Sequence, residues 1–376
     1  MMTTSKLGLY LHIPFCAKKC RYCDFLSFGC SDSKALSEYA QALIQEIRIR
    51  SKDWCFRDVD TVYIGGGTPS LLSAWDMGKI IDALYDNFNI SKEADITIEG
   101  NPATLSDEKM ERYLRKGINR LSLGVQSFEN DVLRYLGRIH DKNDAFTSFQ
   151  RAKRAGFSNI NMDVMFAIPG QSMKMWADTV RQCIFLKPSH ISLYSLQIEE
   201  GTEFYELYKD GKMEAVPESQ DREMYHKALA MMKEAGYKHY EISNAAMPGC
   251  ESRHNLKYWS YAEYLGLGLG ASSFVGGSRM HEYLTAIREH TAPVDRESIE
   301  NYSQREEMGI FVFTGLRKAE GFSLDHFHHV FRKEFFDVYD ADILKKYKGL
   351  LICADGRLYL SERGMDVSNR IMAEFV

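Results

Sequence analysis

Short apolar runs alternate with helix-forming stretches along most of this chain, and this alternation limits the fold more than any other sequence feature. The strand-like runs lie at residues 7–15, 59–64, 95–99, 120–127, 160–165, 190–196 and 240–242. Strands that alternate with helices form parallel βαβ units. We therefore predict an α/β protein whose units, about six or seven of them, form an open or partial (β/α) barrel. A doubly wound sheet is the alternative.

Three cysteines, Cys16, Cys20 and Cys23, follow the first apolar run within eight residues. Thiolates this close cannot easily pair with one another, because a disulfide requires particular Cα separations and side-chain directions. They can instead surround one small polynuclear metal centre. Three thiolates on a four-iron cluster leave one iron without a protein ligand, and that iron can bind another molecule. We predict such a cluster on the loop that leaves the first strand.

These cysteines have two alternative roles. A structural zinc site would need a fourth ligand, which Cys30 could supply at a looser spacing. A disulfide framework would require export, but the segment around Lys6 lacks the pattern of a signal peptide. Eight cysteines without an export signal are typical of cytosolic thiols and metal ligands. We therefore expect a cytoplasmic protein.

Glycines and polar residues recur where the predicted strands end. Residues 65–70 read Gly-Gly-Gly-Thr-Pro-Ser, without the Lys-Ser/Thr ending of a phosphate-binding loop. Glycines let a backbone approach a ligand closely, although a tight turn would also use them. Four polar residues follow on successive units: Glu99, Gln126, Arg138 and Asp163. Together they predict a polar wall around a charged organic ligand, whereas each alone would fit a capping or surface position.

Residues 254–259, His-Asn-Leu-Lys-Tyr-Trp, are rich in ligand and stacking groups. An imidazole beside aromatic rings suits a flat cofactor such as haem, in which histidine is the common axial ligand. From the residues alone we favour the simpler interpretation, a hydrogen-bonded histidine in an aromatic packing corner. The glycine-rich stretch 266–273 is expected to close the active face or to serve close packing.

The pattern changes from about Pro293, where helical stretches precede two short apolar runs joined by Asp355-Gly356, a strong hairpin signal. We predict two domains, a barrel over residues 1–290 and a small winged-helix-like α+β module over residues 291–376. The net charge of −5 with mixed signs argues against a general nucleic-acid binder or a polybasic membrane anchor. Protein contact or a lid is therefore the expected role of the module.

Several of these motifs together resemble the radical S-adenosylmethionine (radical SAM) superfamily, and more narrowly the oxygen-independent coproporphyrinogen III oxidase-like family. The similar segments are residues 10–16, the Cys-x3-Cys-x2-Cys motif, 65–70, 124–127, 163–170 and 254–259. The match is closest to the HemW-type haem chaperone subgroup. Phe25 stands where the authentic oxidases carry a fourth cysteine, which speaks against coproporphyrinogen decarboxylation.

The resemblance implies a role for individual residues. Cys16, Cys20 and Cys23 would hold a [4Fe-4S] cluster. Contacts to S-adenosylmethionine would come from Tyr10, Tyr22, Gly66 and Glu99. A second molecule of it, as held by the oxidases, would contact Gly67, Thr68, Gln126, Arg138 and Asp163. By its place in the motif, His254 is the candidate haem contact.

The resemblance also implies a function. We expect a haem chaperone that binds haem with the cluster and S-adenosylmethionine and delivers haem to an acceptor protein. An electron donor such as flavodoxin or ferredoxin would be a further partner, and a peripheral contact with membrane haem proteins is left open. The alternatives are a radical enzyme acting on a tetrapyrrole, by coproporphyrinogen oxidation or haem ring opening, and a cluster-free scaffold or zinc protein.

Overall fold

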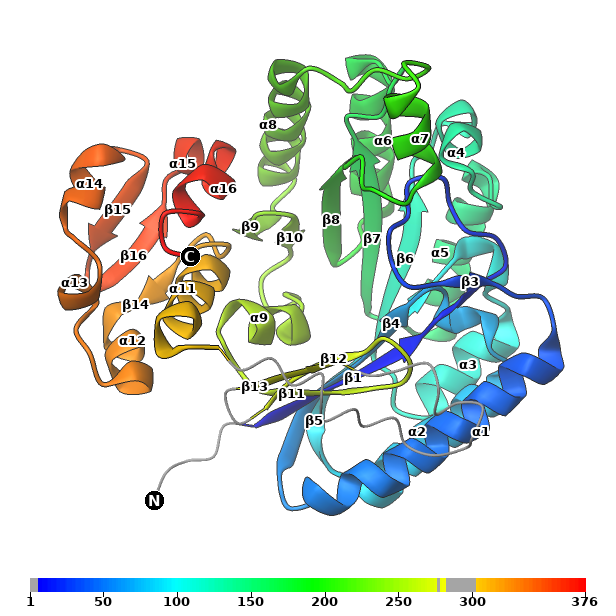
Figure 1. The fold of residues 1–376 in the computed structure, drawn as a ribbon. Helices are drawn as coiled ribbons and strands as arrows, with labels where there is room; N and C mark the ends of the chain where they lie inside the picture. The colour runs from blue at the N-terminus through cyan, green and yellow to red at the C-terminus, as the bar shows by residue number, and fades with distance from the viewer. Residues whose placement is uncertain (1–5, 276–277, 282–301) are drawn as a thin grey trace.

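The computed structural model describes residues 6–275, 278–281 and 302–376, and its main body is built on one mostly parallel sheet (Figure 1). Its six central strands are β1 Leu7–Ile13, β4 Asp58–Gly66, β5 Asn89–Gly100, β6 Arg120–Gln126, β7 Asn159–Phe166 and β8 His190–Ser195. They lie side by side in chain order and all run parallel. A doubly wound sheet would reverse its strand order at one point. The predicted partial barrel is therefore confirmed, and the doubly wound alternative is wrong.

Helices on the outer face of the sheet connect these strands (Figure 1). The connections contain α1 Ser33–Arg50, α2 Ala74–Asn87, α3 Asp107–Arg115, α4 Asn130–Leu136, α5 Lys142–Ala155 and α6 Met173–Leu186, with short 3-10 turns at Ser51–Asp53, Pro69–Leu71 and Pro102–Thr104. Two more helices, α7 Glu203–Lys209 and α8 Glu218–Glu234, follow the last of these strands. Side-chain caps start many of them: Asp32 accepts from the Lys34 amide at α1, and Asp141 with Asp144 forms a capping box at α5. Such caps satisfy amides that have no partner within the helix.

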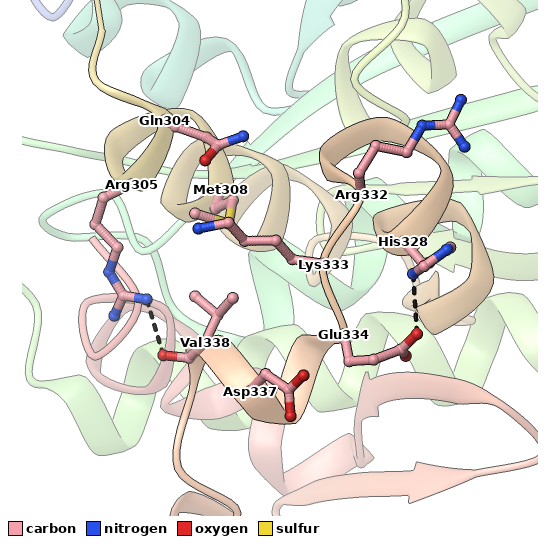
Figure 2. Close-up of a pocket in the computed structure, with 9 residues that line it drawn as sticks. All are labelled: Gln304, Arg305, Met308, His328, Arg332, Lys333, Glu334, Asp337 and Val338. Atoms are coloured by element: carbon pink, nitrogen blue, oxygen red, sulfur yellow. Dashed lines mark hydrogen bonds and ion pairs between the residues drawn. The ribbon is translucent and has the colours of Figure 1, made fainter.

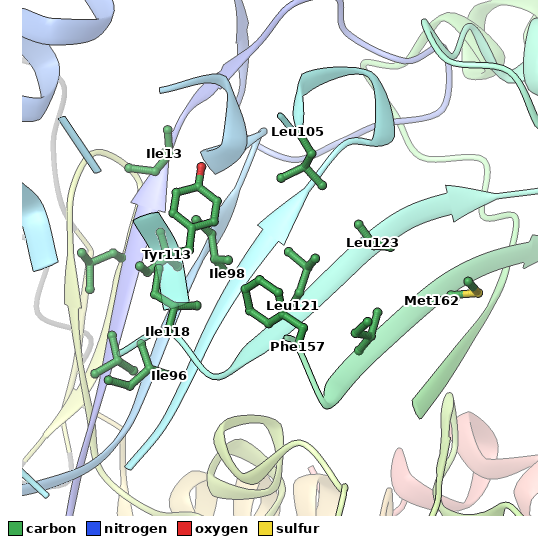
Figure 3. Packing of buried hydrophobic residues seen from close by; sticks show 14 of the residues in the cluster. Ile13, Ile96, Ile98, Leu105, Tyr113, Ile118, Leu121, Leu123, Phe157 and Met162 are labelled. Atoms are coloured by element: carbon green, nitrogen blue, oxygen red, sulfur yellow. The ribbon is translucent and has the colours of Figure 1, made fainter. Parts of the chain in front are cut away.

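Residues along each barrel strand alternate between an apolar outward side and a polar inward side. The outward side chains pack with the helices into one buried cluster, part of which Figure 3 shows around Ile98, Leu121 and Met162. The inward residues of the same strands are polar, such as Glu99, Ser122 and Asn161. Parallel strands covered on both faces are usually apolar throughout. The polar inward residues therefore mark the inside of this barrel as a place for chemistry.

The strand register places the inward side chains in a layer. Glu99 on β5 pairs with Ser122 on β6, Ser122 with Asn161 on β7, and Asn161 with His190 on β8. Hydrogen bonds join the last three: Asn161 Nδ2 donates to Ser122 Oγ at 2.7 Å, and His190 Nδ1 lies 2.6 Å from Asn161 Oδ1. The inside of the barrel is thus a connected polar network rather than an apolar core.

The two edges of the sheet depart from the parallel pattern. Beyond β1 lie β11 Tyr264–Leu267, which is parallel to it, and the antiparallel strands β12 Ser272–Val275 and β13 Ser278–His281. Beyond β8 lie β10 Asn244–Ala246 and β9 Lys238–Glu241, both paired antiparallel. The run at 240–242 therefore ends in a hairpin and adds no further parallel strand, because only two residues connect β9 to β10 and a parallel crossover needs about a dozen.

The C-terminal module (orange to red in Figure 1) lies beside α8 and the short helix α9 Arg253–Trp259. Its helices are α11 Gln304–Gly315, α12 Leu324–Phe331, α13 Phe335–Val338, α14 Asp342–Lys346, α15 Glu362–Asp366 and α16 Ser368–Met372, and its sheet has the order β14 Phe322–Ser323, β16 Arg357–Leu360, β15 Leu351–Ala354. The predicted hairpin turn is present, with positive φ at Asp355 (51°) and Gly356 (70°). Aromatic side chains give the module its own buried cluster.

The module meets the barrel at β9, where Glu241 bridges to Lys318 and the Ala319 amide donates to the Tyr240 carbonyl at 2.9 Å. The predicted boundary between residues 290 and 291 lies outside the described residues, so the division into domains stays a prediction. Within the described ranges, no helix has both the length and the apolar character that crossing a bilayer requires.

Candidate functional site

A cavity of about 430 Å³ opens where the barrel strands end at their carboxyl side. In a (β/α) barrel this edge is where the loops gather functional residues. The predicted site residues that line the cavity are Cys16, Cys20, Tyr22, Cys23, Gly66, Gly67, Thr68, Glu99, Gln126, Arg138 and Asp163. The structure therefore brings together all of the predicted site residues except Tyr10 and His254. We call this space the cluster cavity.

The cysteine loop is closed at its base by backbone pairing. Residues Phe15–Cys16 (β2) pair in parallel with Phe28–Gly29 (β3), and the Cys30 amide donates to the Cys16 carbonyl at 2.8 Å. The loop between these strands carries Cys20 and Cys23, and the Cys23 amide donates to the Cys20 carbonyl at 3.3 Å. Backbone hydrogen bonds thus close the loop at its base.

Arg21 fastens the loop to the helices beside it. Its side chain donates to Glu203 Oε1 at 2.9 Å and to the Tyr135 carbonyl at 3.1 Å, and its guanidinium lies 5.1 Å from the centre of the Phe204 ring. Its backbone amide donates to the Leu136 carbonyl. Because Arg21 points away from the cavity into α4 and α7, the neighbouring Cys20 and Cys23 can face inward.

Polar groups of the barrel approach the thiols directly. Arg138 Nη1 lies 3.3 Å from Cys20 Sγ, and Thr68 Oγ1 lies 3.3 Å from Cys16 Sγ. Burial raises the pKa of the Cys23 thiol, and the nearby Cys20 and Cys16 add to the rise. Three thiols in mutual electrostatic contact beside a cationic donor suit a centre that stabilises thiolates.

Cys30 does not line the cluster cavity; its Sγ faces the Asp32 carbonyl at 3.7 Å. Across the described part of the chain, no three His, Cys, Asp or Glu side chains are arranged around a single metal ion. All eight cysteines are free thiols. The fourth ligand considered for a structural zinc site is therefore not in place.

The glycine stretch at the end of β4 brings backbone against the segment that enters the cysteine loop. A Cβ on Gly67 would lie 2.7 Å from the Phe15 carbonyl oxygen, and one on Gly66 would lie 2.8 Å from the His12 ring. Gly66 also has φ of 109°, a conformation that residues with a Cβ rarely adopt. Only glycines permit this approach, so Gly66 and Gly67 can lie this close to their neighbours, and a ligand cradle at residues 65–67 stays a prediction.

Two buried carboxyl groups face the cavity from β5 and β7. Glu99 accepts a hydrogen bond from Tyr63 Oη at 2.7 Å, and burial together with the nearby Asp163 raises its pKa to about 7. Asp163 accepts from Ser122 Oγ at 3.0 Å and Asn161 Nδ2 at 2.8 Å, while burial raises its pKa as well. A carboxyl group with such a pKa can respond to a ligand's positive charge near neutral pH.

Hydrogen-bonding capacity is left unused at the same edge. Gln126 Oε1 and Arg138 Nε are buried atoms without a hydrogen-bond partner. Gln126 also has φ of 64°, at a point where the pairing of β6 with β7 shifts register. Backbone strain and unpaired polar atoms are costly in a folded protein and concentrate at ligand sites. The cavity therefore fits a polar ligand that would complete these contacts.

His254 lies at the opposite end of the barrel interior, fully buried on α9. Its Nδ1 lies 2.9 Å from Thr61 Oγ1 and its Nε2 lies 2.9 Å from Tyr258 Oη. Burial lowers its pKa to about 3, so the ring is neutral at physiological pH. Gly8 leaves room for it, because a Cβ there would lie 3.2 Å from His254 Cε1. The structure places His254 as a packed, hydrogen-bonded histidine.

Tyr10 lies between these two ends. Its hydroxyl is 2.9 Å from His12 Nδ1, and its ring stacks on Tyr63 with the centroids 6.3 Å apart. Tyr63 in turn contacts Glu99, so Tyr10 reaches the cluster cavity through a neighbour rather than as part of its lining.

Several lining residues were not singled out from the sequence. Tyr63, Ser122 and Tyr194 line the cavity from inward strand positions, and Gln197 and Glu199 line it from the segment after β8. Tyr63, Ser122 and Tyr194 could have been found from the period-two alternation of polar with apolar residues in residues 59–64, 120–125 and 190–195. The two on the irregular segment have no such signal.

Other cavities among the described residues lie outside the cluster cavity. A cleft of about 820 Å³ between the barrel and the C-terminal module, here called the interdomain cleft, shares Tyr194 and Gln197 with the cluster cavity. A groove of about 700 Å³ runs along α8. The third, of about 530 Å³, lies wholly within the module, where Figure 2 shows Arg305 bonded to the Val338 carbonyl and His328 paired with Glu334.

Family models match both parts of the chain. Residues 10–183 match the radical SAM superfamily, and residues 302–367 match the HemN C-terminal domain. The first match contains the cysteine loop, the glycine cradle and the two buried carboxyl groups of the cluster cavity.

The chain is similar to proteins named heme chaperone HemW. It is 37% identical to that of Bacillus subtilis (strain 168) over 98% of both chains, and 34% identical to that of Lactococcus lactis subsp. lactis over 98% of this chain and 96% of the other. A solved structure of coproporphyrinogen III oxidase (HemN) from Escherichia coli, described as a radical SAM enzyme, superposes with a TM-score of 0.84 over 99% of this chain and 90% of that chain. The two sequences are 23% identical, so this superposition shows a shared fold alone.

Proposed function

The chain belongs to the HemW family of radical SAM proteins, and from this premise we propose that it is a haem chaperone. It would bind haem together with a [4Fe-4S] cluster and S-adenosylmethionine, and deliver haem to an acceptor protein. The observation that carries the proposal is its 37% identity to the Bacillus subtilis heme chaperone HemW over 98% of both chains.

The cluster cavity supports the cofactor part of the proposal. Cys16, Cys20 and Cys23 would hold the cluster, since the three thiols line one cavity and the pairing of β2 with β3 closes their loop. Held by these thiols, a cluster would supply a binding site for S-adenosylmethionine and the electron that reduces it. Arg138 beside Cys20 would stabilise thiolate charge there.

The residues around the thiols would position the cofactor. Gly66 and Gly67 bring backbone to the wall of the cavity, and Glu99 and Tyr22 line it on either side. A second molecule of S-adenosylmethionine would contact Thr68 and Asp163 in the same cavity. Gln126 Oε1 would accept a hydrogen bond from it, and Arg138 Nε would donate one to it. This assignment predicts that these side chains act in binding and orientation.

Phe25 favours a chaperone over a decarboxylase. Its side chain is 64% exposed and lines the cluster cavity, at the position where the resemblance places a fourth cysteine in the oxidases. A phenyl ring offers neither a ligand atom nor a proton to the cavity.

A radical enzyme acting on a tetrapyrrole remains the second candidate. It is favoured by one observation: the cluster cavity shares lining residues with the much larger interdomain cleft, which could admit a bulky substrate. Anaerobic incubation with a reductant, S-adenosylmethionine and either coproporphyrinogen or haem tests it. Cleavage of S-adenosylmethionine without any tetrapyrrole product would count against this candidate.

The partners belong to the proposal as well. A haem-acceptor protein and an electron donor such as flavodoxin or ferredoxin follow from the chaperone function and from the need to reduce the cluster. A cytoplasmic location suits eight free thiols, since reducing compartments keep thiols reduced.

Anaerobic reconstitution followed by titration with haem tests the proposal most directly. We expect a stoichiometric haem complex of the cluster-loaded protein and transfer of that haem to an apo-acceptor added in excess. A cluster-loaded protein that forms no haem complex would exclude the chaperone function.

A further inference from the structure

The groove along α8 has a histidine at its edge. His226, Leu229, Ala230 and Lys233 follow one another at the helical spacing of three and four residues and line this groove together. The C-terminal module forms the opposite wall with β16 and α15, and β9 contributes Lys238. We call this space the α8 groove.

His226 is arranged as a metal-ligating histidine usually is. Its Nε2 lies 3.0 Å from Asp366 Oδ2, and its side chain is 48% exposed. Ligating histidines commonly hold one ring nitrogen on a carboxylate, which fixes the tautomer and orients the other nitrogen toward the metal. The other ring nitrogen of His226, Nδ1, makes no hydrogen bond with any of the described residues. The ring is therefore pre-oriented and has one nitrogen available.

The lining of the α8 groove suits a flat apolar ligand with an anionic edge. Leu229, Met365 and Tyr359 supply apolar and aromatic surface. Lys233 and Lys238 supply positive charge, and Glu362 is a carboxylate in the same lining. Its volume of about 700 Å³ lies within the range of small-molecule and cofactor sites.

The other histidines and cavities near the barrel are less suited to iron ligation. His254 has both ring nitrogens in hydrogen bonds and is fully buried. His239 also lines the α8 groove, but its Nε2 faces both Tyr225 Oη and the Ile242 carbonyl. The interdomain cleft, which meets the α8 groove at Tyr225 and Met365, is lined by neither histidine nor cysteine. His226 is thus the histidine of this region with the most accessible ring.

We propose that the α8 groove is the haem site and that His226 is the side chain that ligates the haem iron. The proposal rests on the proposed chaperone function and names the site at which its cargo is held. Lys233 and Lys238 would face the haem propionates, while Leu229 and Met365 would pack against the ring. A half-exposed side chain at the boundary between barrel and module would hold the haem where an acceptor protein can reach it.

The first test replaces His226 in the full-length, cluster-loaded protein and titrates haem. We expect His226→Ala to weaken haem binding by more than about tenfold and to shift the Soret band, because iron loses its protein ligand. Added imidazole should restore the wild-type spectrum. We expect the variant to fold, because His226 is half-exposed and Asp366 keeps Arg222 as a cationic partner at 3.6 Å.

His328→Ala is the matched control. This histidine is 49% exposed and its Nδ1 lies 2.9 Å from Glu334 Oε1, so it has nearly the same exposure and the same kind of carboxylate partner. It lines the cavity within the C-terminal module instead (Figure 2). We expect this variant, and His254→Ala where it folds, to keep wild-type haem affinity and spectrum.

The second test fills the groove without touching the iron ligand. Ala230 is exposed on α8, so Ala230→Trp places a large ring in the groove while the helix is kept. We expect it to reduce haem affinity by about tenfold or more, with unchanged thermal stability and iron content. If this variant binds haem with wild-type affinity, the α8 groove is excluded as the haem site.

The outcomes separate this inference from the proposed function. If wild-type protein binds no haem, the chaperone function fails and the site fails with it. If wild-type protein binds haem and His226→Ala binds it with the same affinity and spectrum, the inference about His226 is overturned while the chaperone function stands.

Discussion

The two ends of the barrel interior both contain predicted ligand-binding residues, but the hydrogen bonding of these residues differs. At the carboxyl end of the strands, Gln126 Oε1 and Arg138 Nε are buried without partners beside three thiols. At the other end, both ring nitrogens of His254 are hydrogen-bonded, to Thr61 and Tyr258. Gln126 and Arg138 have unused bonding capacity, whereas neither ring nitrogen of His254 does.

This difference teaches where to look for a ligand site in an α/β barrel. A ligand-type residue in such a motif, as His254 is, can serve packing alone when its own neighbours satisfy it. A cavity whose polar atoms lack partners needs a further group to complete it, because unpaired buried polar atoms cost about 1–3 kcal/mol each. Five predictions test this comparison, from the largest expected effect to the smallest.

Removal of a thiol at the open end should have the largest effect. We expect Cys20→Ala to lower the iron bound after anaerobic reconstitution by about tenfold or more, because a three-thiolate cluster loses one ligand. Iron and sulfide analysis measures this. Cys30→Ala is the matched control, since Cys30 lies at the end of the same loop but outside the cavity. Equal losses from both variants would contradict the assignment.

Replacement of the satisfied histidine should act on stability instead. We expect His254→Ala to reduce the free energy of unfolding by about 2–4 kcal/mol, because it opens a buried space and leaves Thr61 and Tyr258 unpaired. Denaturant unfolding measures this, with the half-exposed His328→Ala as the control. A change below about 0.5 kcal/mol would show that this end is less tightly packed than the structure indicates.

The same histidine should give the protein a defined pH dependence. Its native pKa of about 3 lies below the unfolded value of 6.5, so the unfolded chain binds more protons between these values. Stability should therefore fall as the pH falls from 6.5 toward 3, and a His254→Gln variant should show a flatter fall over this window.

Much of this arrangement could be predicted from the sequence, for identifiable reasons. The strand runs and their order gave the barrel, and the cysteine spacing with residues 65–70 located the open end. The states of Gln126 and His254 could not be predicted, because they depend on which side chains approach from distant strands: Thr61 and His254 are 193 residues apart. The residues 197 and 199 lie on irregular backbone, where no periodicity reports the direction of a side chain.

Two glycines, one at each end, sharpen the comparison. Gly67→Ala would push a Cβ to 2.7 Å from the Phe15 carbonyl oxygen, and Gly8→Ala would push one to 2.9 Å from Lys257 Cδ and 3.2 Å from His254. Each should cost about 1–3 kcal/mol of stability through overpacking. Only Gly67→Ala should also weaken binding of S-adenosylmethionine, which calorimetric titration of the two variants would reveal. If both variants bind S-adenosylmethionine with equal affinity, residues 65–67 are not part of its binding site.

The smallest effect concerns Glu99. Its pKa of about 7, raised mainly by burial, means that the carboxylate form dominates only above neutral pH. If the carboxylate binds S-adenosylmethionine, affinity should rise by up to about tenfold between pH 6 and pH 8, with proton release on binding below pH 7. Glu99→Gln should remove this dependence, while Glu199→Gln, at an exposed position of the same cavity, should keep it. A Glu99→Gln variant with an unchanged pH profile would place the titrating group elsewhere.

The central claim is that the open end of the barrel holds an incompletely ligated iron–sulfur cluster. Electron paramagnetic resonance of the anaerobically reconstituted, reduced protein, recorded with and without S-adenosylmethionine, tests it most directly. The account predicts about four iron atoms per chain and a cluster signal that changes when S-adenosylmethionine is added. Reconstituted protein without iron, or with a cluster signal that S-adenosylmethionine leaves unchanged, would contradict it.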